Sequence, residues 1–454
     1  EMQVDAVDNL CRLQADHFIG PISQFNQVIG EIPAQPHINN FAASQVTIAQ
    51  NDCDETGSGA SITLVCDSFL LQNYFDSVSQ NNEATNADNA VQTNDVTSLQ
   101  LLDSESDCNE SEDGDNSAFC DLDIVNVVNP IKQVNSALGH EDATIFQNNQ
   151  IDGDDASDIP GISQVMTADN TCDEIGIGTN DAECDMEFLD NFVGDVHQEN
   201  DVIEADSATD IFQDNRALIS QAIDADNDCD ETGIGGGDND AECTIDSLTD
   251  NRLNEITQDN EATGDDNSLF DQDNNVDVSQ SIVAENDCDA SGNSANCLLG
   301  PDDGNPNNIL GITQESTSEL SGDAFSNQLN EVSIDQNAGI VNTCDESGTG
   351  LNDVTCSIGS ENSVDNLVGP MNQHNDASGV DSATISETSN KVDIVQNLQA
   401  TNDCDESNAG ANLAVCSNDV TNRIGFTGGS ISQTNTADGI GIDDIDQDNF
   451  VSIN

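Results

Sequence analysis

Glutamine recurs at three fixed places in a repeat of about 58 residues, and this spacing constrains the fold more than any other feature of the chain. The first place is an apolar-x-Gln-x-Asn motif, in which residues i, i+2 and i+4 share one face of a strand. A second Gln follows about 14 residues later, and a third stands eight residues before a cysteine. Each place therefore predicts a strand. The glutamines of the first motif are Gln24, Gln80, Gln133, Gln198, Gln258, Gln314, Gln373 and Gln433.

The steps between the three places are unequal, at roughly 14, 8 and 35 residues, so the places cannot be three equal small coils. One turn per repeat would put each Gln above its equivalent, and stacked amides can then hydrogen-bond in ladders along the axis. We therefore expect an all-β chain: a β-solenoid or cross-β repeat of about eight coils with Gln and Asn ladders. The second set is Gln92, Gln147, Gln213, Gln272, Gln328 and Gln447, with Glu387 in this place once. The third set is Gln45, Gln100, Gln164, Gln221, Gln280, Gln336 and Gln396.

The alternative architecture is a string of small independent β-domains. Aromatic residues are only 3% of the chain, and about 58 residues with so few of them make a poor isolated core. We therefore treat residues 1–454 as a single repeat domain, with incomplete repeats at 1–52 and 417–454.

Fourteen of the 15 cysteines fall in seven pairs that bound short loops rich in Gly, Asn and Asp, residues that suit tight turns. The spacing predicts seven local disulfides, and paired cysteines indicate an oxidising, extracellular setting. Metal–thiolate ligation is the alternative, but the chain has no Cys-x-x-Cys and its histidines are scattered. The expected pairs are Cys53–Cys66, Cys108–Cys120, Cys172–Cys184, Cys229–Cys243, Cys288–Cys297, Cys344–Cys356 and Cys404–Cys416.

Cys11 is the odd cysteine. Gln3 stands eight residues before it, and the preceding Val-Asp-Asn-Leu resembles the Ala-Asp-Asn-Thr before Cys172. We therefore expect Cys11 to occupy the first-cysteine position of a repeat without a loop, as a free thiol or paired with another chain.

The chain has 89 Asp and Glu against 6 Lys and Arg, a formal net charge of −83. Nucleic acid and anionic membranes would repel it, so neither is an expected partner. Stacked carboxylates need neutralisation by salt, acid or divalent cations, and calcium takes oxygen ligands from Asp-rich loops like these. The alternative is that these residues form solvated turns. The tentative calcium ligands are Asp52, Asp54, Asp228, Asp230, Glu231, Asp238, Asp240, Asp345 and Asp405.

The sequence offers no catalytic constellation. The five histidines lie outside any HExxH motif, and the chain contains neither a Walker loop nor a GxSxG elbow. We therefore expect no catalytic residues, no cofactor other than calcium, and no enzyme activity.

The Gln-bearing segments resemble the curlin repeat of curli-type functional amyloid, which runs Gln, a small residue, Asn-x-Ala and a further Gln. The stretch from Gln373 through Asn375 and Ala377 to Glu387 is similar to it, as are 142–147 and 267–272. This resemblance implies a secreted subunit of an extracellular fibre or matrix, such as that of a biofilm.

The two ends of the chain look complementary. The chain begins near a third-place motif at Gln3 and ends after a second-place motif at Gln447. We expect residues 1–10 to complete the last coil of a neighbouring copy, giving a head-to-tail homopolymer. The alternative is that processing set these ends without such a role. The predicted function is a structural filament subunit; the runner-up is a monomeric, calcium-binding cell-surface stalk or adhesin.

Overall fold

A computed structural model describes most of the chain, and every regular element in that part is a β-strand. The described residues are 7–29, 36–56, 62–111, 116–152, 160–176, 179–205, 210–233, 239–245, 250–264, 268–291, 294–299, 307–321, 324–346, 351–358, 364–380, 384–406, 411–418, 420–424, 431–440 and 445–453. Across these ranges no helix is long and apolar enough to cross a membrane.

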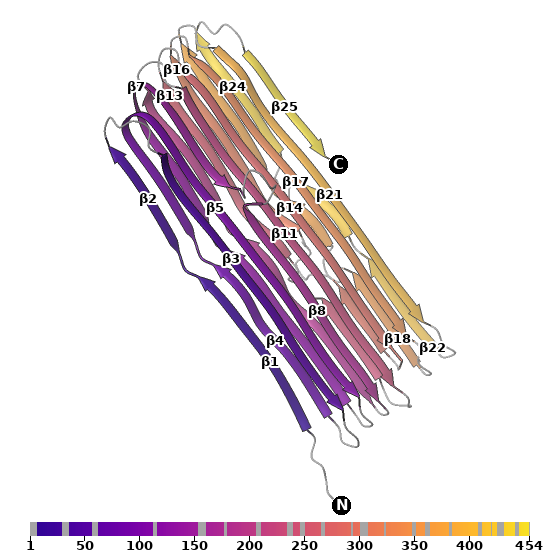
Figure 1. Ribbon diagram of the computed structural model, residues 1–454. Helices are drawn as coiled ribbons and strands as arrows, with labels where there is room; N and C mark the ends of the chain where they lie inside the picture. Colours follow the sequence, from indigo (N-terminus) through magenta and orange to yellow (C-terminus); the bar gives the residue numbers. More distant parts are fainter. Residues whose placement is uncertain are drawn as a thin grey trace, which may run out of the picture.

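The strands form a flattened solenoid in which every coil contributes to two long facing layers (Figure 1). The first layer carries the chain from the second cysteine of a loop to the apolar-x-Gln-x-Asn motif. The chain then crosses over, and the second layer carries it back through the other two Gln places to the next cysteine. Strands pair in parallel with the coils before and after, as one continuous sheet of 25 described strands. Separate small domains do not describe this structure.

The first layer contains most of the shorter strands. They are β1 (Val7–Ile19), β2 (Ile22–Ile29), β4 (Ile62–Phe75), β6 (Asn116–Val128), β9 (Asn180–Val193), β10 (Val196–Ala205), β12 (Asn239–Ile245), β13 (Asp250–Gly264), β15 (Ser294–Leu299), β16 (Asn307–Ser321), β18 (Leu351–Ile358), β19 (Val364–Val368), β20 (Met371–Val380), β22 (Ala411–Asn418), β23 (Val420–Ile424) and β24 (Ile431–Ile440).

The second layer contains longer strands. They are β3 (Pro36–Thr56), β8 (Ile162–Gly176), β11 (Asp210–Gly233), β14 (Leu269–Ala290), β17 (Phe325–Glu346), β21 (Thr384–Glu406) and β25 (Ile445–Ile453). Two strands, β5 (Val78–Ser111) and β7 (Ile131–Ile151), begin in the first layer and continue into the second.

The register confirms one turn per repeat. Gln80 pairs with Gln24 below and with Gln133 above, and the same alignment continues to Gln433. The third set aligns from Gln45 to Gln396 in the same way. The structure adds a fourth strand segment to the three expected per repeat, because residues after each second cysteine also form a strand in the first layer.

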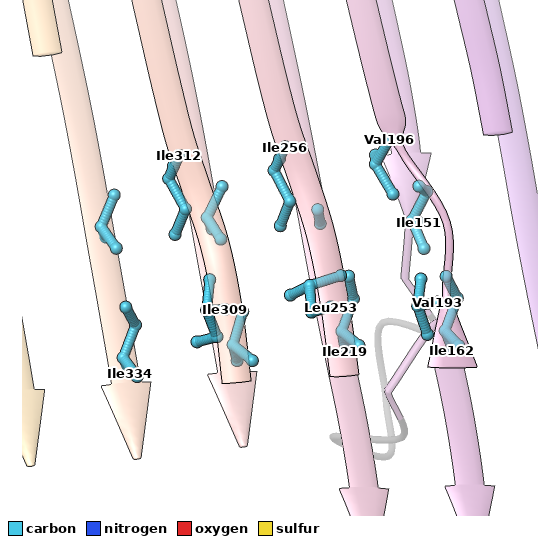
Figure 2. Close-up of a cluster of buried hydrophobic side chains, with 14 of the residues drawn as sticks. Ile151, Ile162, Val193, Val196, Ile219, Leu253, Ile256, Ile309, Ile312 and Ile334 are labelled. Atoms are coloured by element: carbon cyan, nitrogen blue, oxygen red, sulfur yellow. The ribbon is translucent and has the colours of Figure 1, made fainter. Parts of the chain in front are cut away.

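The core lies between the layers, where alternate residues point inward. Four buried apolar clusters occupy successive bands along each coil, separated by bands of Gln and Asn. Figure 2 shows one band, in which Val196, Ile256 and Ile312 of successive coils stack beside Val193, Leu253 and Ile309. Equivalent residues stack because the register repeats the same position in every coil. Each apolar side chain is therefore buried by its equivalents in the coils before and after it.

At the N-terminal end, β1, β2 and β3 supply strands to both layers of the first described coil. At the other end, β24 and β25 stack on β20 and on the first half of β21. The described residues place no strand above Val395–Glu406, the second half of β21.

Candidate functional site

The interior amides form ladders whose hydrogen bonds have a fixed direction. In the first-motif column, the Nε2 of each Gln donates to the Oε1 of the Gln one coil nearer the N-terminus, at 2.8 to 3.0 Å. The other two Gln columns donate in the same direction, as Gln164 does to Gln100 and Gln213 to Gln147.

The asparagine ladders run the opposite way. Asn82 Nδ2 donates to Asn135 Oδ1 one coil nearer the C-terminus, at 3.0 Å. In the second layer, Asn149 donates to Asn215 at 2.9 Å, again towards the C-terminal coil. Gln and Asn columns of opposite polarity therefore lie side by side. In each interior coil, the Gln amides donate to the coil before it and the Asn amides donate to the coil after it.

The ladders also join the two layers. Gln198 Nε2 lies 2.9 Å from the backbone oxygen of Arg216, and Asn200 Nδ2 lies 2.9 Å from Asn215 Oδ1. These side chains are fully buried. Buried amides are stable in such a position only when they are hydrogen-bonded, so the ladders fix both the register and the spacing of the layers.

The structure contains one buried Asn column that was not predicted from the sequence. Asn73, Asn126 and Asn191 are buried in the first layer, and each donates to the backbone of the facing layer. The signal was present, because an Asn stands seven residues before the motif glutamine in six successive coils. These residues are Asn73, Asn126, Asn191, Asn251, Asn307 and Asn366.

The second Gln column departs from the expectation at one coil. A register shift after Ser326 aligns Gln328 with Thr388, so Thr388 occupies the place expected for Glu387. Thr388 is buried and pairs with Gln447 in the next coil.

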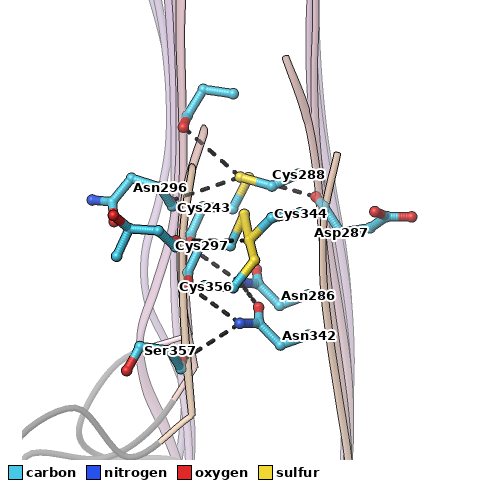
Figure 3. The surroundings of a disulfide bond; sticks show 12 residues. Cys243, Asn286, Asp287, Cys288, Asn296, Cys297, Asn342, Cys344, Cys356 and Ser357 are labelled. Carbon is cyan, nitrogen blue, oxygen red and sulfur yellow. Dashed lines mark hydrogen bonds between the residues drawn. A yellow bond between two sulfur atoms is a disulfide. The ribbon is translucent and has the colours of Figure 1, made fainter. Parts of the chain in front are cut away.

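The cysteines align in two columns at the loop end of the coils, and those from Cys53 to Cys356 form a buried cluster (Figure 3). The first column consists of Cys53, Cys108, Cys172, Cys229, Cys288, Cys344 and Cys404, aligned by register. The second column consists of Cys11, Cys66, Cys120, Cys184, Cys243, Cys297, Cys356 and Cys416.

The pairing within these columns differs from the expected loop disulfides. The structure joins Cys11 to Cys53 and Cys66 to Cys108, which corrects the expected pairs Cys53–Cys66 and Cys108–Cys120. Cys344 is within bonding distance of both Cys297 and Cys356, the second being an expected partner. The physical reason is that facing layers bring cysteines 42 to 47 residues apart as close together as the loops do.

Cys11 lies in the second column, paired in register with Cys66. The expectation that it occupies a first-cysteine position is therefore wrong. Sequence similarity before the cysteine suggested that position, but Val7–Leu10 pair with Ile62–Val65 of the first layer. The correction also removes the sequence match on which the proposed role of Gln3 rested; Gln3 itself lies outside the described residues.

The tentative calcium ligands lie mainly on two outward-facing columns that flank the first cysteines. Asp228 aligns with Asp287, and Asp230 with Asp173, Asp289 and, through Asp289, Asp345. Asp52 and Asp54 begin these columns, and Asp405 follows Asp345. Asp238 lies outside the described residues, and Asp240 lies in β12 of the other layer.

Glu231 has a different environment. It is buried, and its carboxylate accepts hydrogen bonds from Asn180 Nδ2 at 3.1 Å and Ser291 Oγ at 3.3 Å. Over the described ranges, the groups of three ligand atoms within 4.8 Å are cysteine sets: Cys66, Cys108 and Cys120, and Cys297, Cys344 and Cys356. Calcium binding therefore stays a prediction.

Burial, and after it the stacking of like charges, raises several carboxylate pKa values. Burial, with repulsion from Asp230 and Asp287, raises the pKa of Asp228 to about 7. Burial, with repulsion from Glu315 and Glu199 in the coils above and below, raises the pKa of Asp259 to about 7 as well. These columns bind protons near neutral pH, because a proton removes both the desolvation cost and the repulsion.

No protein-family model, curated protein or solved structure matches this chain. The repeat itself is therefore the basis for inferring function.

Proposed function

We propose that this protein is a structural subunit of an extracellular filament or matrix, in which copies stack head to tail. The observation that carries the proposal is the fixed polarity of the ladders. Because Gln rungs donate towards the N-terminal coil and Asn rungs towards the C-terminal coil, the two ends of the solenoid differ in their hydrogen-bonding character.

Head-to-tail stacking would continue both polarities. Gln24 in the first described coil would meet Gln433 of the next copy, in the donor-to-acceptor sense of the Gln373–Gln433 rung. Head-to-head stacking would oppose donors to donors. A head-to-tail contact does not close on itself, so it generates a filament.

The apolar core of the first coil supports the same contact. Ile19, Ile22 and Phe41 pack on the main cluster but are only partly buried, whereas their register partners Phe75, Val78 and Val96 are fully buried. β4 and β5 bury one side of these three residues, and a stacked copy would bury the other side. Burial of apolar area stabilises such a contact by about 25 cal/mol per Å².

The expected role of residues 1–10 needs revision. Residues 7–10 belong to β1 of the first coil. The main contact is instead coil on coil, through β1, β2 and β3.

Secretion fits this proposal, because disulfides persist in oxidising compartments. Absence of catalysis stays a prediction.

Electron microscopy of purified protein at pH 5.5 and pH 8, each with and without millimolar calcium, tests the proposal. Eight coils at ~4.8 Å predict filaments with a subunit repeat near ~38 Å and a 4.8 Å layer line. Dispersed single particles under all four conditions, at protein concentrations up to about 1 mM, would contradict it. Calcium-dependent stabilisation of such particles would favour the runner-up, a calcium-binding stalk.

A further inference from the structure

The two cysteine columns allow two alternative disulfide sets. A first-column cysteine lies opposite the second-column cysteine of its own coil, as Cys53 lies opposite Cys11. The cysteine loop connects the same residue to the second-column cysteine of the following coil, as it connects Cys53 to Cys66. One set closes the coils and the other closes the loops. A sulfur forms one disulfide, so the two sets exclude each other at every cysteine.

The structure favours coil closure. The disulfides Cys11–Cys53, Cys66–Cys108 and Cys297–Cys344 all join cysteines of one coil. The sulfurs of Cys120 and Cys172, also in one coil, are 2.7 Å apart. Cys344–Cys356 is the one loop-closing contact of bonding distance among the described cysteines, and it competes with Cys297 for Cys344.

We propose that residues 1–454 carry the coil-closing set throughout, which leaves Cys416 without a partner among the cysteines of these residues. The set is Cys11–Cys53, Cys66–Cys108, Cys120–Cys172, Cys184–Cys229, Cys243–Cys288, Cys297–Cys344 and Cys356–Cys404. The inference is independent of whether copies polymerise.

Pairing at one end decides the rest of the column. Once Cys53 is bonded to Cys11, Cys66 has only Cys108 as a first-column neighbour, and the same reasoning passes along the chain to Cys356 and Cys404. Coil closure thus pairs 14 of the 15 cysteines, Cys11 among them, and leaves Cys416, whereas loop closure pairs 14 and leaves Cys11. Cys416 follows Cys356 in register, and no first-column cysteine follows it in the sequence.

Each bond forms when two thiols lose two protons and two electrons in total. The oxidant is a second disulfide, that of a thiol–disulfide oxidoreductase or of oxidised glutathione, which is reduced to two thiols.

Coil closure makes each coil a covalent ring and leaves the cysteine loops as the only links between rings. This arrangement predicts opposite results for two backbone cuts. A cut within 112–115 lies between the rings 66–108 and 120–172, so it should separate the chain into two pieces. A cut within 141–143 lies inside the ring 120–172, so the pieces should stay joined. Loop closure predicts the reverse in both cases.

The experiment inserts one recognition site for a specific protease at 112–115 in one variant and at 141–143 in a matched variant. Each protein is secreted or oxidised with glutathione, alkylated in urea without reductant, cleaved, and run on non-reducing and reducing gels. The reducing gel verifies cleavage. We expect two fragments from the first variant and one full-size band from the second on the non-reducing gel.

The reverse pattern, or both patterns in comparable amounts in one sample, would overturn the proposal. Mass spectrometry of the alkylated wild-type chain gives a second readout. Alkylation of Cys416 alone supports coil closure, whereas alkylation of Cys11 alone, or of all 15 cysteines, contradicts it.

Discussion

The side-chain amide of Gln198 donates to the side-chain oxygen of Gln133 one coil below, at 2.8 Å. Gln258 in turn donates to Gln198, also at 2.8 Å. All three glutamines are fully buried, so loss of one side chain leaves a neighbouring polar atom without a hydrogen-bond partner.

Gln198→Ala should therefore destabilise the solenoid strongly. It leaves the Gln133 Oε1 atom without its donor and removes the hydrogen bonds from Gln198 to the backbone oxygens of Asn149 and Arg216. An unsatisfied buried polar group costs about 1–3 kcal/mol. The unfolding free energy from urea titration measures this loss. Gln399→Ala, on an exposed position of β21, is the control and should change the unfolding free energy by less than about 0.5 kcal/mol. Equal effects of the two substitutions would contradict the ladder as a source of stability.

Stability should fall as pH rises from about 4, the ordinary pKa of an aspartate, to about 7. Burial and neighbouring carboxylates raise the pKa of Asp259 and Asp228 to about 7 in the folded protein. A raised pKa means that the folded state binds the proton more tightly, so this contribution is complete below the unfolded pKa and is lost as pH passes the folded pKa. Thermal unfolding at pH 5 and pH 8 measures the effect, and added salt should recover part of the loss at pH 8.

Asp259→Asn should reduce the difference in Tm between pH 5 and pH 8, because the amide cannot ionise between Glu199 and Glu315. Asp16→Asn, on an exposed position of β1, is the matched control and should leave the difference unchanged. A Tm that rises from pH 5 to pH 8 in the wild-type protein would refute this account.

Ile22→Lys should block filament growth while leaving the coil folded. Ile22 points inward at the first coil, and an inward-pointing charge at an edge strand opposes further stacking. We expect the critical concentration for polymerisation, measured by sedimentation, to rise at least about tenfold, or ~1.4 kcal/mol. Ser23→Lys points outward on the same strand and should polymerise nearly as the wild-type protein does. Unchanged polymerisation of Ile22→Lys, with its circular dichroism spectrum intact, would count against coil-on-coil stacking.

Gly369→Ala should destabilise the corner between β19 and β20. A Cβ atom at Gly369 would lie 2.0 Å from the backbone oxygen of Leu310 in the coil below, so the two backbones would have to separate. We expect a loss of at least about 2 kcal/mol in unfolding free energy. Gly339→Ala is the control, because nothing lies within 4 Å of the added methyl group. A neutral Gly369→Ala would show that the corner is looser than described.

Several parts of the fold followed from the sequence because identical motifs can stack only in one register. The apolar-x-Gln-x-Asn motif gave the alignment from Gln24 to Gln433, and the Gln before each first cysteine gave the alignment from Gln45 to Gln396. The Asn seven residues before six of the eight motif glutamines was nearly as regular, but the sequence analysis did not use it because the segment after the second cysteine was not expected to form a strand.

The sequence by itself determined the length of the coil, the identity of the stacked residues and the all-β class, since each follows from a repeat that must place like above like. Only the tertiary structure decided which cysteines face each other, which column Cys11 joins and in which direction the amides donate. Those features depend on contacts between the two layers, such as Cys11 with Cys53, and the distance between facing layers is not encoded in the spacing along one strand. Near-identical local motifs therefore determined the register between coils, while the contacts between cysteines of the two layers depended on the folded chain.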